Sequence, residues 1–115
     1  MKFEKSLLSG STSMLVLSLL KDRDKYGYEM ISQLALRSEN VFEMKEGTLY
    51  PVLHALERDG YVESYEKETE AGRKRRYYHL TDRGSRQLQE QTDQWRVFSG
   101  AVDKILEPHQ IGYPI

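Results

Sequence analysis

Cysteine is absent from this 115-residue chain, which excludes a disulfide framework and any metal site built from thiolates. The longest apolar run, Met14 to Leu17, is far too short to span a bilayer. The first five residues lack the apolar core of a signal peptide. These absences are compatible with a cytoplasmic protein that has no membrane partner.

Histidine is scarce as well. The three histidines, His54, His79 and His109, have no metal-ligand spacing and no plausible nucleophile partner in the sequence. We therefore expect no metal, no cofactor and no enzymatic activity. The composition, 38% hydrophobic and 30% charged, is polar for so small a monomer, because small domains bury a smaller share of their surface. One domain, with an appended helix and a tendency to form oligomers, fits these numbers.

The net charge of −1 argues against a nucleic-acid partner, but the distribution of charge argues for one. Residues 57–70 hold six acids and two bases, whereas residues 73–86 hold six bases and one acid. A local field attracts phosphates even when the whole chain is nearly neutral.

Two helices are expected in the first third of the chain. Ser6 to Leu20 is apolar nearly all round, which predicts a core helix that also meets a partner chain. After a solvated charged loop at residues 21–25, a second helix is expected over residues 26–37. Its buried stripe is predicted to consist of Tyr28, Ile31, Leu34 and Ala35.

The segment from Lys45 to Tyr61 predicts a short helix with two different faces. One face is an apolar stripe formed by Leu49, Val52, Leu53 and Leu56. The other face carries Thr48, Tyr50, Pro51, His54 and Arg58. Such a helix suits insertion into a DNA major groove, although an ordinary amphipathic surface helix has the same pattern. Pro51 requires either a helix that begins near Thr48 or a kinked first turn.

A β-hairpin is expected next, with strands at residues 61–66 and 75–80. Gly72 lies near its tip, and four consecutive bases follow: Arg73, Lys74, Arg75 and Arg76. Basic residues also protect exposed strand edges against aggregation. Directly after a candidate recognition helix, however, a phosphate-contacting wing is the better interpretation.

A long last helix is expected from the N-cap Thr81 to about Glu107, before Pro108. Leu88, Trp95 and Val102 recur every seven residues along it, and Gln91, Phe98 and Ile105 interleave as the second position of the same seam. This seam packs either on a second copy or back on the first helix. The chain then divides into a DNA-binding domain (1–80), a dimerisation helix (81–107) and a flexible tail (108–115).

Three blocks of the sequence resemble the PadR family of transcriptional regulators. The blocks are Tyr26 to Glu29, Gly47 to Val62 and Gly72 to Gly84. The resemblance covers roughly residues 10–106, and the short chain with one terminal helix resembles the family's smaller subgroup. It implies an α+β, mostly helical fold: a winged helix-turn-helix with a long C-terminal dimerisation helix.

The resemblance also implies a homodimeric repressor that binds a palindromic operator in double-stranded DNA. The helix after Lys45 would be the recognition helix, and the basic strand would be the wing. The implied DNA-binding residues are Thr48, Tyr50, Pro51, His54, Arg58, Arg73, Lys74, Arg75 and Arg76. The first and last helices would form the dimer through Leu15, Leu88, Trp95, Phe98, Val102 and Ile105.

Some family members release DNA when a small aromatic compound binds, and Trp95 lies where certain members have a tryptophan in the effector cavity. Trp95 could equally fill the dimer core. The alternative to a regulator is a winged-helix protein–protein interaction module without effector or DNA specificity. Four adjacent bases beside a groove-shaped helix favour the regulator.

Overall fold

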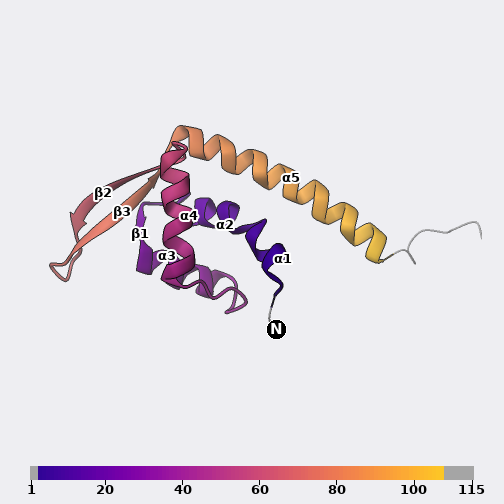
Figure 1. Cartoon of the computed structure of the whole chain (residues 1–115), viewed down its shortest axis with the longest axis horizontal. Coiled ribbons are helices and arrows are strands. Elements are labelled where there is room, and N and C mark those ends of the chain that lie inside the picture. The colour runs from indigo at the N-terminus through magenta and orange to yellow at the C-terminus, as the bar shows by residue number, and fades with distance from the viewer. Residues whose placement is uncertain (1–2, 108–115) are drawn as a thin grey trace, which may run out of the picture.

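The computed structural model describes residues 3–107, which form five helices and three strands (Figure 1). In chain order they are α1 (Lys5–Ser9), α2 (Thr12–Leu19), β1 (Lys25–Tyr26), α3 (Gly27–Arg37), α4 (Glu46–Arg58), β2 (Val62–Glu68), β3 (Lys74–Leu80) and α5 (Asp82–Leu106). The strands form one antiparallel sheet in the order β1-β3-β2. The expected α+β, mostly helical fold with a hairpin and a long last helix is confirmed.

The core lies where α2, α3 and α4 meet one face of the sheet. Its fully buried side chains come from every one of these elements and include Val16, Leu17, Met30, Leu49, Leu53, Val62 and Tyr78. Leu49, Leu53 and Leu56 are buried as the apolar stripe of α4 predicts. The opposite face of α4 is thereby left at the surface.

The first helix is divided, whereas the sequence predicts one helix from Ser6 to Leu20. α1 ends at Ser9, and α2 begins at Thr12 after a break at Gly10. The hydroxyls of Ser11 and Thr12 both donate to the Leu8 carbonyl, at 3.1 and 2.8 Å. Such local bonds compete with helical hydrogen bonds, and glycine disfavours a helix interior.

Lys25 is buried, which corrects the prediction that residues 21–25 form a solvated loop. Its side chain is almost completely buried, and its ammonium donates to the Leu19 carbonyl at 2.6 Å and to Asp22 Oδ1 at 2.7 Å. These bonds compensate for the loss of water. The hydrogen bond from Lys25 also lowers the pKa of Asp22 to about 2.

The second helix buries Leu34 and half-buries Ile31 and Ala35 as predicted, but the prediction for Tyr28 is wrong. Tyr28 is 66% exposed, and Met30 occupies the core position instead. α3 begins at Gly27, directly after β1, with the Glu29 carboxylate accepting from the Tyr26 backbone N–H at 3.2 Å. The two-residue strand β1 therefore determines which face of α3 turns toward the core. So short a strand leaves no periodicity to detect in the sequence.

α5 begins in the domain and then projects away from it (Figure 1). The Thr81 hydroxyl caps the helix by accepting from the Gly84 N–H at 2.9 Å, as the sequence predicts. The early turns pack on α2 and bury Leu88, whereas the later turns extend the molecule to 67 Å in its longest dimension. The predicted tail at residues 108–115 lies outside the described residues.

Candidate nucleic-acid interface

α4 presents a surface face that carries the side chains expected to meet DNA. Thr48, Pro51, His54 and Arg58 are all exposed on it. The helix begins at Glu46 rather than near Thr48, so Pro51 lies inside it. Proline has no N–H, and the Gly47 carbonyl one turn earlier consequently receives no helical hydrogen bond from it.

Tyr50 differs from its exposed neighbours on α4. Its ring is half-buried against the core, and a Cβ atom placed on Gly27 would overlap its hydroxyl. The Tyr50 ring can therefore occupy this position only because residue 27 has no side chain. The rings of Tyr50 and His54 lie 6.4 Å apart, so Tyr50 supports the inner side of His54 while the imidazole stays exposed.

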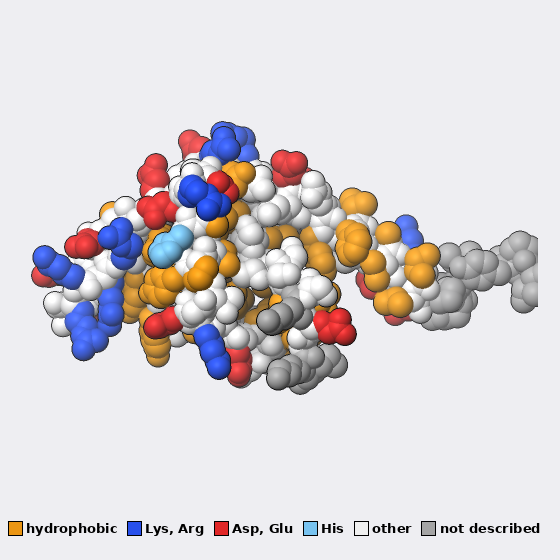
Figure 2. Space-filling view, viewed as in Figure 1, with side chains coloured by type: hydrophobic (Ala, Val, Ile, Leu, Met, Phe, Trp, Pro, Cys, Tyr) orange, Lys and Arg blue, Asp and Glu red, His pale blue; other side chains and the backbone are white. Residues whose placement is uncertain are grey.

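β2 and β3 form the hairpin that projects beside α4 (Figure 1). Its tip is closed by a hydrogen bond from the Thr69 N–H to the Arg73 carbonyl at 2.8 Å. Gly72 in this turn has φ +80°, a left-handed conformation that favours glycine. Figure 2, drawn from the same side, shows Lys and Arg side chains gathered at this end of the molecule.

The four consecutive bases of the hairpin are not equivalent. Arg76 donates to the Ser64 hydroxyl at 3.0 Å and lies 3.8 Å from the Glu66 carboxylate. The Arg75 guanidinium lies over the Tyr26 ring at 5.7 Å. Within residues 3–107, the side chains of Arg73 and Lys74 make no hydrogen bond, ion pair or cation–π contact. These two cations extend into solvent at the tip.

A cluster that sequence reasoning missed fastens the hairpin to the turn before β1. The Asp24 carboxylate accepts from the Tyr65 hydroxyl at 2.5 Å and lies 2.8 Å from His79 Nδ1. Burial raises the pKa of Asp24, but the bonds from Tyr65 and His79 outweigh it and hold that pKa below its ordinary value. The same bond from Tyr65 raises the pKa of its hydroxyl to about 12.

Three tyrosines continue this cluster across the outer face of the sheet. Tyr65 stacks on Tyr77 with ring centroids 5.8 Å apart, and Tyr26 meets Tyr77 edge-on at 5.3 Å. The contacts join all three strands on the side away from the core. They stiffen a hairpin whose far end has only its own strand pairing for support.

The residues expected at the dimer interface fall into two groups. Leu88 lies in the chain's own core with only 6% of its surface exposed, and Leu15 packs partly against that core. Trp95, Phe98, Val102 and Ile105 are exposed on the projecting part of α5, where Figure 2 shows hydrophobic side chains. The seven-residue pattern thus runs from an intramolecular contact into an uncovered apolar surface.

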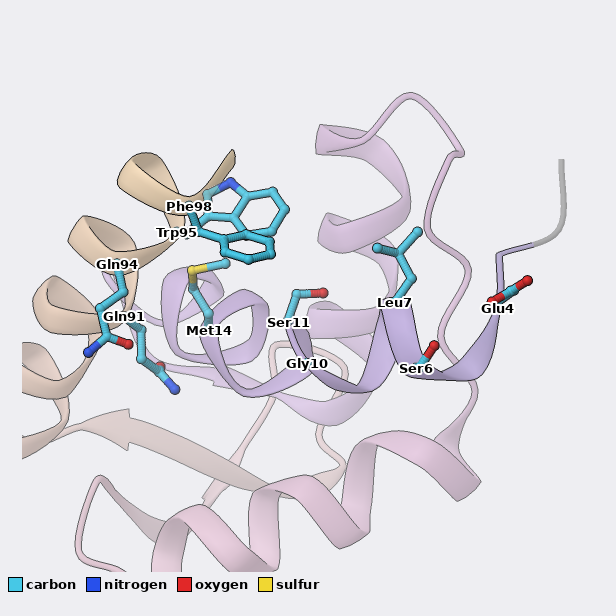
Figure 3. Close-up of a pocket in the computed structure, with 10 residues that line it drawn as sticks. All are labelled: Glu4, Ser6, Leu7, Gly10, Ser11, Met14, Gln91, Gln94, Trp95 and Phe98. Atoms are coloured by element: carbon cyan, nitrogen blue, oxygen red, sulfur yellow. The ribbon is translucent and has the colours of Figure 1, made fainter. Parts of the chain in front are cut away.

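Trp95 also lines a cavity of about 680 Å³ between α5 and the N-terminal helices (Figure 3). Its ring lies 6.4 Å from that of Phe98, and both rings lie over Met14 in the figure. The remaining lining residues are Glu4, Ser6, Leu7, Gly10, Ser11, Gln91 and Gln94. Volumes of this size are typical of small-molecule sites.

The described residues contain no helix with the length and apolar character that crossing a bilayer requires. Within the same residues, no group of three or more His, Asp or Glu side chains is arranged to hold a metal ion.

Known proteins resemble this chain over most of its length. The sequence pattern of the transcriptional regulator PadR-like family matches residues 16–90. An uncharacterized protein from Lysinibacillus sphaericus is 33% identical over 101 residues, which is 88% of this chain and 93% of that protein.

Solved structures show the same arrangement. A transcriptional regulator from Clostridium thermocellum superimposes with a TM-score of 0.81 at 28% identity, covering 90% of this chain and all of that one. A PadR-like transcriptional regulator from Bacillus cereus gives a TM-score of 0.79 at 30% identity, covering 90% of this chain and 98% of that one.

Proposed function

The chain belongs to the PadR-like family of transcriptional regulators, which are not enzymes, and we propose that it is a homodimeric repressor released from DNA by a small aromatic effector. It acts in the cytoplasm on a palindromic operator. Its α4 enters the major groove, and its hairpin serves as the wing that contacts the adjacent phosphates.

The observation that carries the proposal is the pairing of α4 with the unpartnered cations of the wing. The exposed face of α4 offers His54 and Arg58, which reach outward from a helix anchored by buried leucines. Arg73 and Lys74 project from the tip of the hairpin beside it. Base contacts from a helix and phosphate contacts from a flanking element are the two components of operator binding.

The uncovered apolar half of α5 supports the proposal of a homodimer. Trp95, Val97, Phe98, Ile105 and Leu106 are all exposed within one helix, which is costly in water for a lone chain. A second copy related by a two-fold axis covers both surfaces at once. The same symmetry places two α4 helices on successive major-groove faces, about 34 Å apart.

The cavity beside Trp95 supports the proposal that an effector releases the protein from DNA. An aromatic compound there touches both α5 and the N-terminal helices, the elements that determine how two DNA-binding domains are spaced. The effector binds preferentially to a dimer whose two DNA-binding domains are spaced differently from those of the operator-bound dimer, so it lowers the affinity of the protein for the operator. By linkage, operator DNA lowers the affinity for the effector by the same factor.

The test is binding of His54→Ala to the DNA upstream of the protein's own coding region and to random DNA of equal length. A base contact in each half-site is worth ~1–3 kcal/mol, so its removal should weaken operator binding at least tenfold and change binding to random DNA little. His54 is a cleaner probe than Tyr50, because Tyr50 also packs against Gly27.

The matched control is Glu90→Ala, an exposed position on α5 away from α4. It is expected to bind both DNAs as the wild type does. An equal weakening on both DNAs for His54→Ala would contradict a groove-reading role. Failure of the wild type to prefer any upstream fragment would contradict operator binding itself.

A further inference from the structure

Asp24 holds two strands of the sheet at once, although it belongs to neither of them. It lies in the turn before β1, and its two carboxylate oxygens have different partners. Oδ1 lies 2.8 Å from His79 Nδ1 on the middle strand β3, and Oδ2 accepts from the Tyr65 hydroxyl on β2 at 2.5 Å. The carboxylate therefore connects this turn to β2, the strand with which β1 does not pair.

The body of the domain fixes Asp24 at its end of this connection. The next residue, Lys25, is almost completely buried, and its ammonium donates to the Leu19 carbonyl and to Asp22. Strand β1 begins at Lys25 and pairs with β3. A carboxylate beside such an anchor can hold a strand that would otherwise move.

The hairpin beyond this point has no third strand to support it (Figure 1). β1 pairs with β3 only as far as Tyr77, whose partner on β2 is Tyr65. From that level to the last pair, Glu68 with Lys74, β2 and β3 pair only with each other. This outer part is roughly 10 Å long, because a strand rises about 3.4 Å per residue.

A small rotation at the level of Tyr65 is enlarged at the tip of the hairpin. Twist between neighbouring strands commonly varies by about 20°, and turning the outer part by that angle moves its tip by roughly 3 Å. Such a shift is as long as a hydrogen bond to a phosphate. Arg73 and Lys74 at the tip then keep a phosphate only in fewer rotamers, at a cost in entropy.

We propose that Asp24 is a positioning residue for DNA binding: its bonds to Tyr65 and His79 fix the inclination of the hairpin and thereby place the cations of its tip beside the DNA. Asp24 itself touches no DNA in this role. The inference rests on the proposed function, in which the hairpin is the wing, and it makes part of the affinity of the wing depend on a residue outside it.

Asp24→Asn and Asp24→Ala separate these bonds from the charge, because both variants remove the same negative charge. The asparagine amide still accepts from the Tyr65 hydroxyl and can donate to the neutral imidazole of His79, whereas alanine makes neither bond. Both variants are made in the wild-type chain and in a chain that also carries Arg73→Gln and Lys74→Gln. Fluorescence anisotropy measures the affinity for the DNA upstream of the coding region.

Without these bonds, each wing samples inclinations that do not reach the phosphates. If the binding inclination is populated about a third of the time, the two wings of a dimer weaken binding by roughly tenfold. Asp24→Ala should therefore bind roughly tenfold more weakly than Asp24→Asn, with a shallower dependence on salt. In the chain without Arg73 and Lys74 the two variants should bind equally, because the cations that Asp24 positions are gone.

Tyr65→Phe gives a second measurement that leaves every charge in place. It removes the hydroxyl that donates to Asp24 and keeps the ring that stacks on Tyr77. The matched control is Tyr77→Phe, since the Tyr77 hydroxyl makes no hydrogen bond among residues 3–107. Tyr65→Phe should weaken DNA binding severalfold, and Tyr77→Phe should leave it unchanged. This pair decides the matter if Asp24→Ala does not fold.

Equal affinities of Asp24→Ala and Asp24→Asn in the wild-type chain would overturn the positioning role, as would equal affinities of Tyr65→Phe and Tyr77→Phe. A difference that persists without Arg73 and Lys74 would also overturn it, because Asp24 would then act other than through the wing. In all these results the wild type still binds DNA, so the proposed function stands. A wild type that binds no DNA would contradict the proposed function and the positioning role together.

Discussion

Replacing Arg73 and Lys74 together by glutamine is expected to make operator binding much less sensitive to salt. Both cations project from the wing without a partner among the described residues, so each is free to displace one counterion from DNA. Each phosphate contact contributes about 0.9 to the slope of log affinity against log salt concentration.

The size of the effect follows from the proposed symmetry. Two wings with two cations each make four phosphate contacts, so the slope should become shallower by about 3.6. Between 50 and 200 mM salt, the affinity advantage of the wild type should therefore shrink by roughly a hundredfold. Fluorescence anisotropy with labelled operator at several KCl concentrations measures both quantities.

Arg76→Gln is the matched control for the double variant. Arg76 donates to Ser64 and lies near Glu66, so contact with a phosphate would require it to leave both. Its replacement should change the slope much less than the replacement of either Arg73 or Lys74. An unchanged slope in the double variant would contradict phosphate contacts by Arg73 and Lys74. The basic run would then be a solvated strand edge, as in a protein-binding winged helix.

Three further outcomes follow from the fold. Gly84→Ala should lower the free energy of unfolding by roughly 3 kcal/mol, because the new Cβ overlaps the Tyr61 carbonyl oxygen; a decrease below about 1 kcal/mol in urea denaturation would contradict this. Asp22→Asn should flatten the pH dependence of stability between about pH 4 and pH 2. The bond from Lys25 lowers the folded-state pKa of Asp22 from 3.8 to about 2, so its contribution is present above that range and disappears as pH falls through it. An identical pH dependence in both proteins would count against it. Ile105→Asp, at a side chain 77% exposed on α5, should yield folded monomers by light scattering, and a persistent dimer would exclude this interface.

The helical pattern of α4 can be predicted from the sequence because its burial is local. Leu49, Leu53 and Leu56 recur at helical spacing, and one buried face fixes the other as exposed. The cap of α5 can be predicted for the same reason, since Thr81 and Gly84 are three residues apart. Tyr50 shows the limit of such patterns, because its burial depends on the absence of a side chain at Gly27 on another helix.

Contacts between distant residues cannot be predicted in this way. Asp24 meets Tyr65 and His79 only because β1 pairs with β3, and a two-residue strand has no detectable periodicity. Lys25 has the composition of a surface residue, and its burial depends on the Leu19 carbonyl and Asp22 being in place.

The candidate site shows the same division. The sequence presents the four wing bases as equals, and the pairing of β2 with β3 brings Arg76 beside Ser64 and Glu66. The seven-residue pattern of α5 does not reveal that Leu88 is covered by the same chain while Ile105 is not. Whether a residue of α5 is covered depends on where along the helix its contact with α2 ends.

The apolar half of α5 is separate in the chain from the wing, and this arrangement has a genetic consequence in the proposed dimer. An allele without Arg73 and Lys74 keeps the whole surface by which two copies associate. In a cell making both chains equally, random association leaves only about one quarter of the dimers with two intact wings. Such an allele should be trans-dominant, derepressing the operator even beside a functional gene, whereas an allele truncated before Trp95 should be recessive.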